Sequence, residues 1–534
     1  MDSSSFDERE LETRHIRSDR LERGLAGGGV SSSNNSTTTS GLSASLKQTP
    51  TWIIYMLVGM AVLVMLSLTL NIVLYVIGLK QHTEEIVVPK NVIFMIGDGF
   101  GPAAQTFARF MMKNSVTQNK SLALDPFLVG SSRTFSSDSD VTDSAAGATA
   151  FSCALKSYNG AIGVDPSKKP CGTLLEAALK KGMRTGLVAT NPVTDATPAA
   201  FSAHVSHRSM QDKIAYQQIR MMSDLFGKMR DRKYGIDIIM GGGRSYFIPK
   251  ESNGSLRKDS IDLVQMAKDQ GYQYVTNVDE LLKADKLPLL GLFAPTTMKY
   301  TIDRLETNEP EPTLPQMTTK ALELISKNNE NGFFLMVEGS RIDHCAHSND
   351  IACQWQEVIA YNEAFKIVQE FAANNPDTLV ISTADHETGG ITLNRDVDGN
   401  SEYAFYTEQI RPIKHSTEYI ANLITDPTNF TQVSLILSQN GIPSLSSSEH
   451  ALMQSIQPPL MFGIDEVINR RARIGFSTRG HTAVDVNVYS FGPGSQNYYG
   501  NRDNTDVGKI VANLLGFNLT DITTMVNIYM NANP

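Results

Sequence analysis

Eight side chains that can bind metal ions stand at or just after apolar segments of this chain. Glu338 and Thr197 supply a carboxylate and a hydroxyl, and the other six are Asp98, Asp343, His347, Asp385, His386 and His481. Imidazole together with carboxylate suits Zn²⁺, whereas carboxylate, hydroxyl and water suit Mg²⁺. Each residue alone would more commonly be a helix cap or a surface group. Their conjunction predicts two kinds of metal site.

The spacing within two segments supports this prediction. Asp343 and His347 are four residues apart and share one face if a helical turn follows the strand. Asp385 and His386 follow an apolar segment and can turn into one cleft. Five of the 10 histidines lie in or beside such segments, namely His204, His344, His347, His386 and His481.

A serine precedes a run of small residues in the segment 142–150, Thr-Asp-Ser-Ala-Ala-Gly-Ala-Thr-Ala. At a helix N-terminus, backbone N–H groups and the helix dipole would face an anion formed on Ser144. This favours a nucleophile that becomes a phosphoserine, and a neighbouring Zn²⁺ would activate its hydroxyl without a histidine base. The alternative for Ser144 is an ordinary helix N-cap.

Arg208 ends the segment 195–208, which also contains Asp195 and Thr197. An arginine can clamp two phosphate oxygens in a bidentate manner. Taken alone, Arg208 would be a solvated surface residue.

The fold that must position these residues is α/β. Apolar segments at 92–96, 186–189, 236–240, 333–337 and 378–381 alternate with helix-like stretches. This pattern predicts a large, mainly parallel central sheet flanked by helices on both faces. Because ligands bind beyond the carboxyl ends of such strands, the polar clusters after the strands should converge. Residues from about 395 to 475 break the alternation and are predicted to form an insertion at the rim.

A membrane anchor is predicted near the N-terminus. Residues 52–79 contain no Asp, Glu, Lys or Arg, and roughly 20 apolar residues suffice to cross a bilayer. A buried core helix is the alternative. The polar tail 1–51 is expected to be disordered, and the late position of the apolar run favours an uncleaved signal anchor. Residues 80–534 would then form the catalytic domain.

Charges beside the anchor do not settle its orientation. Beyond it lie four glycosylation sequons, at Asn119, Asn253, Asn429 and Asn518, together with all 4 cysteines. Both features suit a lumenal domain. We therefore expect a single-pass type II membrane protein with a cytosolic N-terminus and a glycosylated body.

The four cysteines allow three pairings into two disulfides. Cys153 with Cys171 and Cys345 with Cys353 are neighbours in sequence and form the simplest of the three. Their number and spacing do not fit a Cys-x-x-Cys zinc site.

Composition excludes several classes of protein. The chain has 534 residues, 41% apolar and 19% charged, with a formal net charge of −9. These values argue against wholesale disorder, a coiled coil or a collagen-like protein. The acidic balance, without a basic tract, argues against nucleic-acid recognition.

Six segments together resemble the alkaline phosphatase family, in the order that the family has them. They are 97–101 (Gly-Asp-Gly-Phe-Gly), 142–150, 195–208, 337–347, 383–388 (Thr-Ala-Asp-His-Glu-Thr) and 480–482 (Gly-His-Thr). The resemblance covers roughly residues 88–520. With its signal anchor, the chain is most similar to vacuolar members of the family, which implies the vacuole membrane. The family also implies a homodimer that acts on small-molecule or peptide phosphomonoesters, with a broad substrate range and an alkaline pH preference.

The resemblance also implies roles for single residues, with two Zn²⁺ and one Mg²⁺ per active site. Ser144 would be the nucleophile and Arg208 the phosphate clamp. One zinc would be held by Asp343, His347 and His481, and the other by Asp98, Asp385 and His386. Asp98, Thr197 and Glu338 would hold magnesium. Asp195 would order waters on magnesium, and His344 would be a weak, titratable phosphate contact.

Two alternatives stay open on sequence alone. A related metallohydrolase, such as a phosphodiesterase or sulfatase, is one, although no Cys-x-Pro-x-Arg segment typical of sulfatases occurs. An inert binding protein that keeps its metals for stability is the other, although neither Ser144 nor any expected metal ligand is missing.

Overall fold

The computed structural model describes residues 50–81, 88–112, 120–304, 310–456 and 458–533. The chain separates into two units, Met1–Thr83 and Glu84–Pro534, which we describe one at a time. Most of the predicted tail 1–51 and the sequon at Asn119 lie outside the described residues. The other three sequon asparagines are exposed on the second unit.

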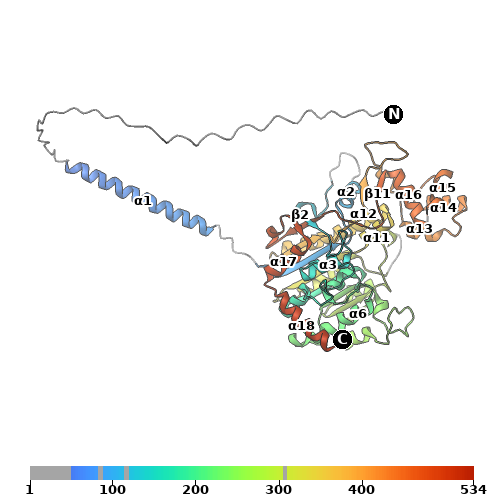
Figure 1. The fold of residues 1–534 in the computed structure, drawn as a ribbon, viewed down its shortest axis with the longest axis horizontal. Coiled ribbons are helices and arrows are strands. Elements are labelled where there is room, and N and C mark those ends of the chain that lie inside the picture. Colours follow the sequence, from blue (N-terminus) through green and yellow to red (C-terminus); the bar gives the residue numbers. More distant parts are fainter. Residues whose placement is uncertain (1–49, 82–87, 113–119, 305–309, 457, 534) are drawn as a thin grey trace, which may run out of the picture. The chain divides into compact units, whose positions relative to one another are not determined.

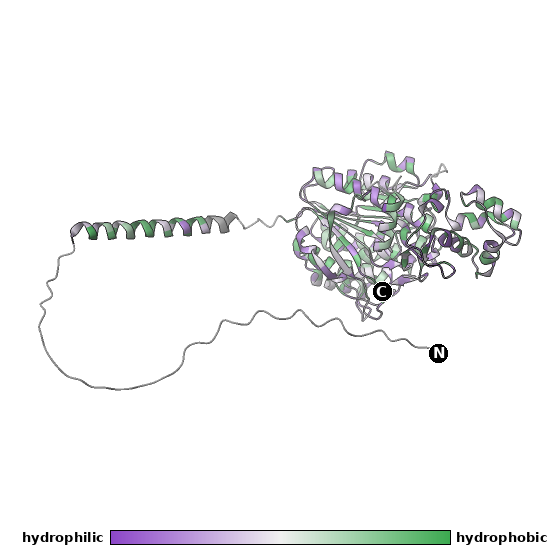
Figure 2. Cartoon of the chain, turned by 90° about the horizontal axis from the view of Figure 1, so that it is seen from above, coloured by the Kyte–Doolittle hydropathy of each residue, from purple (hydrophilic) through white to green (hydrophobic). Residues whose placement is uncertain are grey.

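The described part of the first unit is one helix, α1 (Thr51–Gln81). Within it, Thr51–Tyr75 is long and apolar enough to cross a membrane, and its window of highest hydropathy is entirely unburied. Figure 2 shows this helix mostly in the colours of hydrophobic residues. An α-helix that is apolar all round needs either a protein core or a lipid environment. This feature fits the predicted anchor at 52–79.

A ten-stranded sheet forms the centre of the second unit, in the order β14-β2-β13-β8-β1-β7-β3-β4-β6-β5. All five predicted strands belong to it. They are β1 (Asn91–Gly97), β3 (Arg184–Pro192), β4 (Ile238–Gly242), β7 (Phe333–Gly339) and β8 (Thr378–Thr383). The remaining strands are β2 (Leu128–Arg133), β5 (Gln273–Val275), β6 (Leu289–Leu292), β13 (Val486–Phe491) and β14 (Gly500–Asp503). Only β13 among them pairs antiparallel with its neighbours, so the sheet is mainly parallel as predicted.

Two hydrophobic cores cover the two faces of the sheet. Alternate residues of β1 point into different cores, with Ile93 and Met95 in one and Val92, Phe94 and Ile96 in the other. This is the period of two that an extended strand imposes. A strand buried on both faces therefore reads as a continuous apolar segment, which explains why the central strands were visible in the sequence.

Helices close both cores, and Figure 2 shows them on either side of the sheet. The first core is covered by α2 (Pro102–Met111), α10 (Leu314–Ser326), α11 (Arg341–Ser348) and α12 (Ile351–Asn374). The second is covered by α3 (Ser144–Cys153), α4 (Leu174–Lys180), α5 (Ala196–Ser202), α7 (Leu263–Asp269) and α17 (Asn504–Leu515). Shorter helices also reach the cores, α8 (Val278–Lys283) and α9 (Thr301–Arg304) the first and α6 (Gln211–Tyr216) the second. The helix α18 (Leu519–Ala532) packs against α4 in a smaller cluster.

The predicted rim insertion is mostly helical. It contains α13 (Thr417–Leu423), α14 (Phe430–Gln439), α15 (Ser447–Ser455) and α16 (Met461–Ala472), which Figure 1 shows together at one margin of the unit. Two short strands, β10 (Ile391–Leu393) and β11 (Ile474–Phe476), pair antiparallel at its base. Ile420, Val433 and Ile464 extend the first core into this insertion.

The structure has two disulfides, and they are the simplest of the three pairings. Cys153 is joined to Cys171 and Cys345 to Cys353, with Cα–Cα distances of 5.9 and 5.6 Å. The second disulfide links α11 to the beginning of α12. It therefore restrains the short helix that carries Asp343 and His347.

Candidate active site

The carboxyl ends of three adjacent parallel strands bring the predicted ligands together. Strand β1 lies between β7 and β8, with Gly97 opposite Gly339 and Ile96 opposite Thr383. Asp98 follows β1, Glu338 lies near the end of β7, and Asp385 follows β8. The register therefore places three carboxylates from distant parts of the chain at one edge of the sheet, where an α/β protein binds its ligand.

A first set of donors, which we call site A, consists of Asp343, His347 and His481. Both Asp343 and His347 lie on α11, and the His347 Nε2 atom is 3.1 Å from Asp343 Oδ2. His481, in the short strand β12 (His481–Thr482), has its Nε2 atom 3.2 Å from His347 Nε2 and 3.6 Å from Asp343 Oδ1. Two ring nitrogens this close to one carboxylate are arranged as ligands around a common point. The one-face prediction for α11 is confirmed.

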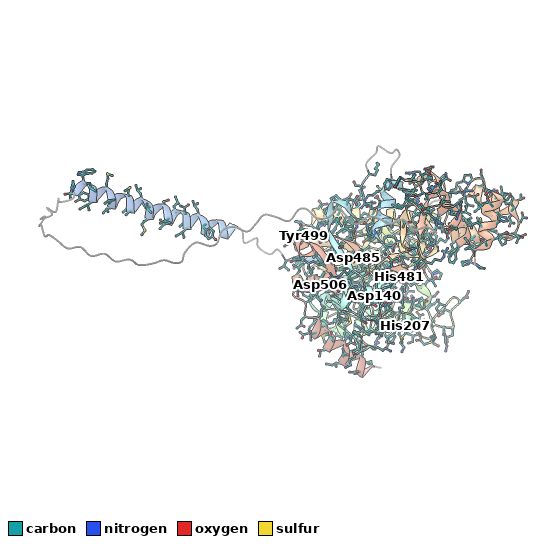
Figure 3. All side chains as sticks on the ribbon, turned by 45° about the horizontal axis from the view of Figure 1, so that its top comes forward. Asp140, His207, His481, Asp485, Tyr499 and Asp506 are labelled. Atoms are coloured by element: carbon teal, nitrogen blue, oxygen red, sulfur yellow. A yellow bond between two sulfur atoms is a disulfide. The ribbon has the colours of Figure 1, made fainter. Side chains whose placement is uncertain are left out.

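The two imidazoles of site A are oriented by backbone carbonyl groups. The Nδ1 atom of His347 contacts the carbonyl oxygen of Arg479, and that of His481 lies 2.8 Å from the carbonyl oxygen of Thr142. If each Nδ1 carries the proton and donates it there, each Nε2 keeps a lone pair that faces the site. His481, labelled in Figure 3, has 13% of its side chain exposed.

A second set, site B, gathers around His386, which is fully buried. Its Nε2 atom is 3.2 Å from Asp385 Oδ2, 3.5 Å from Asp98 Oδ1 and 3.1 Å from the Ser144 hydroxyl oxygen. The His386 and His481 rings stack with centroids 3.5 Å apart, so sites A and B are adjacent. Asp343 can reach both sites, because its carboxylate also groups with Asp98 and His386.

A third set, site C, is formed by Asp98, Thr197 and Glu338. The Thr197 hydroxyl and the Glu338 Oε2 atom are buried, and neither has a hydrogen-bond partner among the described residues. Orphaned buried oxygens are costly unless something outside the chain satisfies them. A hard cation fits this need, since its preferred ligands are carboxylate and hydroxyl oxygens.

Three buried carboxylates of sites B and C, those of Asp98, Asp385 and Glu338, carry more negative charge than the fold compensates. Burial, with further repulsion from neighbouring carboxylates, raises the pKa of Asp98 well above its usual range and that of Asp385 to about 7. Burial also raises the pKa of Glu338 to about 8. Bound cations would reverse this effect by stabilising the ionised forms. The donor set and its electrostatics thus fit metal ions.

Ser144 occupies the first position of α3, and its neighbour caps the helix. Asp143 is the N-cap and accepts a hydrogen bond from the Ala146 backbone N–H over 2.9 Å, so the N-cap alternative for Ser144 is wrong. The small residues that follow let α3 approach the sheet edge closely. A Cβ added to Gly147 would lie 3.1 Å from the Cβ of Asp385. The close packing places the serine hydroxyl within site B.

Arg208 is held by two carboxylates. Its guanidinium donates to Asp143 Oδ2 over 3.3 Å and to Asp195 Oδ1 over 3.1 Å, while 30% of its side chain stays exposed. Burial alone would lower the pKa of Arg208, but Asp195, Asp143 and Asp98 raise it above its ordinary value. The partners and the partial exposure are those of an anion clamp that is oriented in advance.

Asp195 and His344, the two residues expected to support the site, have protein partners. Asp195 accepts a bond from the Asn191 side-chain amide over 2.5 Å in addition to the bond from Arg208. His344 contacts Arg341 through Nδ1, and its Nε2 atom lies 3.5 Å from the Asn191 side-chain nitrogen. Burial and the Arg341 charge lower the pKa of His344 to about 4. The imidazole is therefore neutral at alkaline pH.

Sequence reasoning missed several supporting residues and grouped one histidine wrongly. No role was assigned to Asp143, or to Thr388, whose hydroxyl donates to Asp343 Oδ1 over 2.5 Å and contacts His386 Nδ1 at 3.2 Å. Asp143 and Thr388 lie inside the segments 142–150 and 383–388 that resemble the family. Their place in these segments was the one sign in the sequence that they support the site. His204 is not part of the site, because its ring pairs with Glu176 in the interior.

Comparison with known proteins agrees with this geometry. The family model described as "Alkaline phosphatase" matches residues 89–517, which is well over half of the chain. The chain belongs to the alkaline phosphatase family. It is therefore an enzyme and a hydrolase of that family, and the predicted family and fold are confirmed.

Individual relatives extend over most of the chain. The repressible alkaline phosphatase of Saccharomyces cerevisiae is 42% identical over 480 residues, which cover 82% of this chain and 83% of the relative. A solved cold-active alkaline phosphatase from Shewanella sp. is 34% identical to this chain, with a TM-score of 0.69. The match covers 80% of this chain and 99% of the Shewanella chain. A variant of TAB5 alkaline phosphatase with Mg bound in its M3 site is 28% identical, with a TM-score of 0.57. The match covers 81% of this chain and 99% of the TAB5 chain. These likenesses and the donor clusters make the family's metal dependence a property of this enzyme.

Proposed function

We propose that this enzyme hydrolyses phosphate monoesters to an alcohol and inorganic phosphate through a covalent phosphoserine on Ser144. The observation that carries the proposal is the position of the Ser144 hydroxyl. It lies at the first residue of α3, 3.1 Å from His386 Nε2, and the cap of the same helix also holds Arg208. A nucleophile, an anion clamp and metal ligands thus meet at one point.

The metal ions that we propose are two Zn²⁺ and one Mg²⁺. Asp343, His347 and His481 would hold one zinc ion at site A, and Asp98, Asp385 and His386 would hold the other at site B. Glu338 and Thr197, with Asp98, would hold magnesium at site C, where their orphaned oxygens support an oxygen-seeking cation. When bound, the zinc ions would act as Lewis acids that stabilise negative charge on oxygen.

The residues of this chain would perform the reaction in two displacements. Arg208 binds two phosphoryl oxygens and turns the phosphorus towards Ser144. The serine oxygen forms a bond to phosphorus while the ester P–O bond breaks, and the serine proton leaves with the alcohol product. Water then attacks the phosphoserine, so the Ser–O–P bond breaks, the serine regains a proton and inorganic phosphate departs.

The substrate range follows from what the site grips. Arg208 and the metal ligands contact the phosphoryl group, and a site of this kind accepts many leaving groups. We therefore propose a broad range of small-molecule and peptide phosphomonoesters. Two observations support an alkaline preference. A phosphate monoester, whose second pKa is about 6, is a full dianion at alkaline pH. Arg208 stays positively charged at the same pH, because its pKa is raised.

Membrane attachment and assembly complete the proposal. Residues 52–79 would form a type II signal anchor, with the tail 1–51 in the cytosol and the domain 80–534 in the lumen of the vacuole. The apolar helix supports the anchor, and the two disulfides and the exposed sequons at Asn253, Asn429 and Asn518 support an oxidising, glycosylating compartment. A homodimer is proposed from the family alone. Fractionation of a tagged full chain tests the location, and recovery mainly at the cell surface would contradict it.

The decisive experiment is hydrolysis of a chromogenic phosphate monoester by the detergent-solubilised full chain. Activity should disappear on chelation and return only with both Zn²⁺ and Mg²⁺. Ser144→Ala should reduce kcat by at least about 10³-fold with metal content unchanged. The exposed Ser137 gives a matched control, and Ser137→Ala should retain activity. Near-normal turnover by the metallated Ser144→Ala enzyme would refute the nucleophile, and preference for a diester would favour the phosphodiesterase alternative.

A further inference from the structure

A second concentration of buried oxygen atoms lies outside the active site, where the rim insertion meets the core. Asp350 is the N-cap of α12, Thr417 is the first residue of α13, and Asp465 lies in α16. All three side chains are buried. We call this place the α12–α13–α16 junction.

Asp465 is the residue that calls for an explanation. It is 1% exposed, and neither of its carboxylate oxygens has a hydrogen-bond partner among the described residues. Burial and the nearby Asp350 carboxylate raise its pKa well above the usual range. A buried carboxylate without donors is among the most expensive groups that a fold can contain, so it is normally paired or bound to a cation.

Both carboxylate oxygens of Asp350 accept hydrogen bonds at the junction. Its Oδ2 atom accepts the Thr417 backbone N–H over 2.7 Å and the Thr417 hydroxyl over 3.0 Å, and its Oδ1 atom accepts the Cys353 N–H over 2.9 Å. The Thr417 hydroxyl also lies beside Asp465, but its single proton is donated to Asp350. The two carboxylates thus share a neighbour, and Asp465 gains no donor from it.

Two amide side chains add further unsatisfied oxygens. Asn469 lies one helical turn after Asp465, and its nitrogen donates to the Asn349 carbonyl over 2.9 Å while its oxygen is buried without a partner. Gln354 lies one turn after Asp350, and its oxygen and nitrogen are both buried without partners among the described residues. Side chains at i and i+4 share a helix face, so the Asn469 amide extends the face of Asp465 within α16. Asp350 is the N-cap of α12, so this rule does not place Gln354 beside it.

The positive charge that acts on Asp465 comes from Arg479, and it is committed elsewhere. Its Nη1 atom donates to the Ser348 carbonyl over 2.5 Å, and its guanidinium lies over the Phe462 ring at 3.4 Å. Within the described part of the chain, Arg479 therefore makes no hydrogen bond to Asp465, and it leaves the pair of carboxylates undercompensated. An additional cation would supply both the missing charge and the missing contacts.

We propose that the α12–α13–α16 junction binds a divalent cation, Ca²⁺, through Asp465, Asp350 and the side-chain oxygen of Asn469. Calcium accepts carboxylate, amide and hydroxyl oxygens in flexible geometry, whereas magnesium demands a near-ideal octahedron. The ion would link the rim insertion to α12, which follows the helix carrying His347. It is separate from sites A, B and C, and it does not depend on the proposed phosphoserine chemistry.

The test is calcium binding to the full chain in detergent, with sites A, B and C kept saturated by Zn²⁺ and Mg²⁺. Equilibrium dialysis against radioactive Ca²⁺ should find one ion per chain. Asp465→Asn should weaken this binding at least about 10-fold. The exposed Asp396, in the same insertion, gives a matched control, and Asp396→Asn should bind calcium as the wild type does. Calcium should also raise the Tm of the wild type and the control.

Two outcomes would overturn the proposal. No calcium bound by the wild-type chain at millimolar free Ca²⁺ would mean that water or a proton satisfies Asp465. Equal binding by wild type and Asp465→Asn would place the ion elsewhere. If Asp465→Asn does not fold, Asn469→Ala should still weaken binding, and unchanged affinity in that variant would count against the site. Stoichiometry is measured without substrate, so this result is independent of the proposed phosphatase activity.

Discussion

The Asp195 carboxylate holds the Arg208 guanidinium, with Arg208 Nη2 donating to Asp195 Oδ1 over 3.1 Å. The residue expected to order waters at the magnesium site is thus bonded to the proposed phosphate clamp. Its other oxygen accepts the Asn191 amide, so the carboxylate is fixed from both sides. Asp195 connects two functions that the sequence kept apart.

Asp195→Asn should therefore act through Arg208. The variant loses the charged hydrogen bond between Asp195 and Arg208 at a partly exposed position. This loss should weaken transition-state binding by about 1–2 kcal/mol and so lower kcat/KM about 5- to 30-fold. Inhibition by inorganic phosphate should weaken in parallel, because product and substrate share the clamp. Steady-state kinetics with phosphate as inhibitor measure both. Asp140→Asn, at an exposed carboxylate, is the control, and unaltered phosphate inhibition in Asp195→Asn would contradict the assigned role.

His481→Gln should remove one zinc ion per chain. The glutamine keeps a polar side chain but loses the nitrogen that faces His347 and Asp343. Zinc affinity at site A should fall about 10- to 100-fold or more, while site B keeps its ion. Metal analysis after dialysis gives the stoichiometry. His207, an exposed histidine also labelled in Figure 3, provides the matched variant His207→Gln, and equal zinc content in the two variants would argue against site A.

Thr197→Val should separate magnesium binding from folding. The hydroxyl has no hydrogen-bond partner among the described residues, so its replacement by a methyl group breaks no bond in the protein. Without Mg²⁺ the variant should be as stable as the wild type or more so, since a buried orphan is removed. With Mg²⁺ present, the magnesium needed for half-maximal activity should rise.

The control for this prediction lies in strand β3, which precedes the helix α5 that carries Thr197. Thr185 also has a buried hydroxyl without a partner among the described residues, but it stands at the amino end of the strand. Thr185→Val should leave the magnesium requirement as it is. A requirement that does not rise in Thr197→Val, measured by activity against free Mg²⁺, would remove this residue from site C.

His204 and Glu176 form a buried pair whose contribution to stability should depend on pH. Their side chains meet at 2.9 Å and are 0% exposed. Burial alone would lower the pKa of His204, but Glu176 raises it above the ordinary value of about 6.5. A raised pKa in the folded state means that the stabilisation is complete below pH 6.5 and is lost as the pH rises through the folded pKa.

His204→Asn should therefore lower the free energy of unfolding most at mildly acidic pH. Breaking a buried pair is expected to destabilise by about 3–5 kcal/mol, and the deficit relative to wild type should shrink between pH 6 and pH 9. Thermal unfolding of the metal-saturated chain at several pH values measures this difference. Glu176→Gln tests the same pair from the other side. A deficit that is constant with pH in both variants would show that the pair is not charged.

The central strands were predictable because burial on both faces leaves a continuous apolar segment, as in β1 and β8. The proposed ligands Asp98 and His386 could be singled out because they follow such strands. The edge strand β14 is largely exposed and β5 has only 3 residues, so neither leaves this signal. The direction of β13 is a property of its pairing, which periodicity does not encode.

Contacts made by loops and by distant helices could not be predicted in the same way. Thr388 supports Asp343 across 45 residues, and Asn191, at the end of β3, donates to Asp195 at the N-cap of α5. The junction of Asp350 and Asp465 depends on how a helical insertion packs against α12. Single-sequence patterns record the burial of each helix but not which polar side chains end up opposite one another.

Gly147 couples the position of the proposed nucleophile, Ser144, to that of a proposed metal ligand, Asp385. Because nothing but a hydrogen atom separates the α3 backbone from Asp385 at this position, the helix rests directly against the end of β8. Any larger side chain would act as a wedge, shifting Ser144 and Asp385 in opposite directions by a few tenths of an ångström. Gly147 takes no part in the proposed chemistry, but it sets the position of the Ser144 hydroxyl. In a mutational survey, larger residues at position 147 should reduce activity as strongly as substitutions of the proposed metal ligands do.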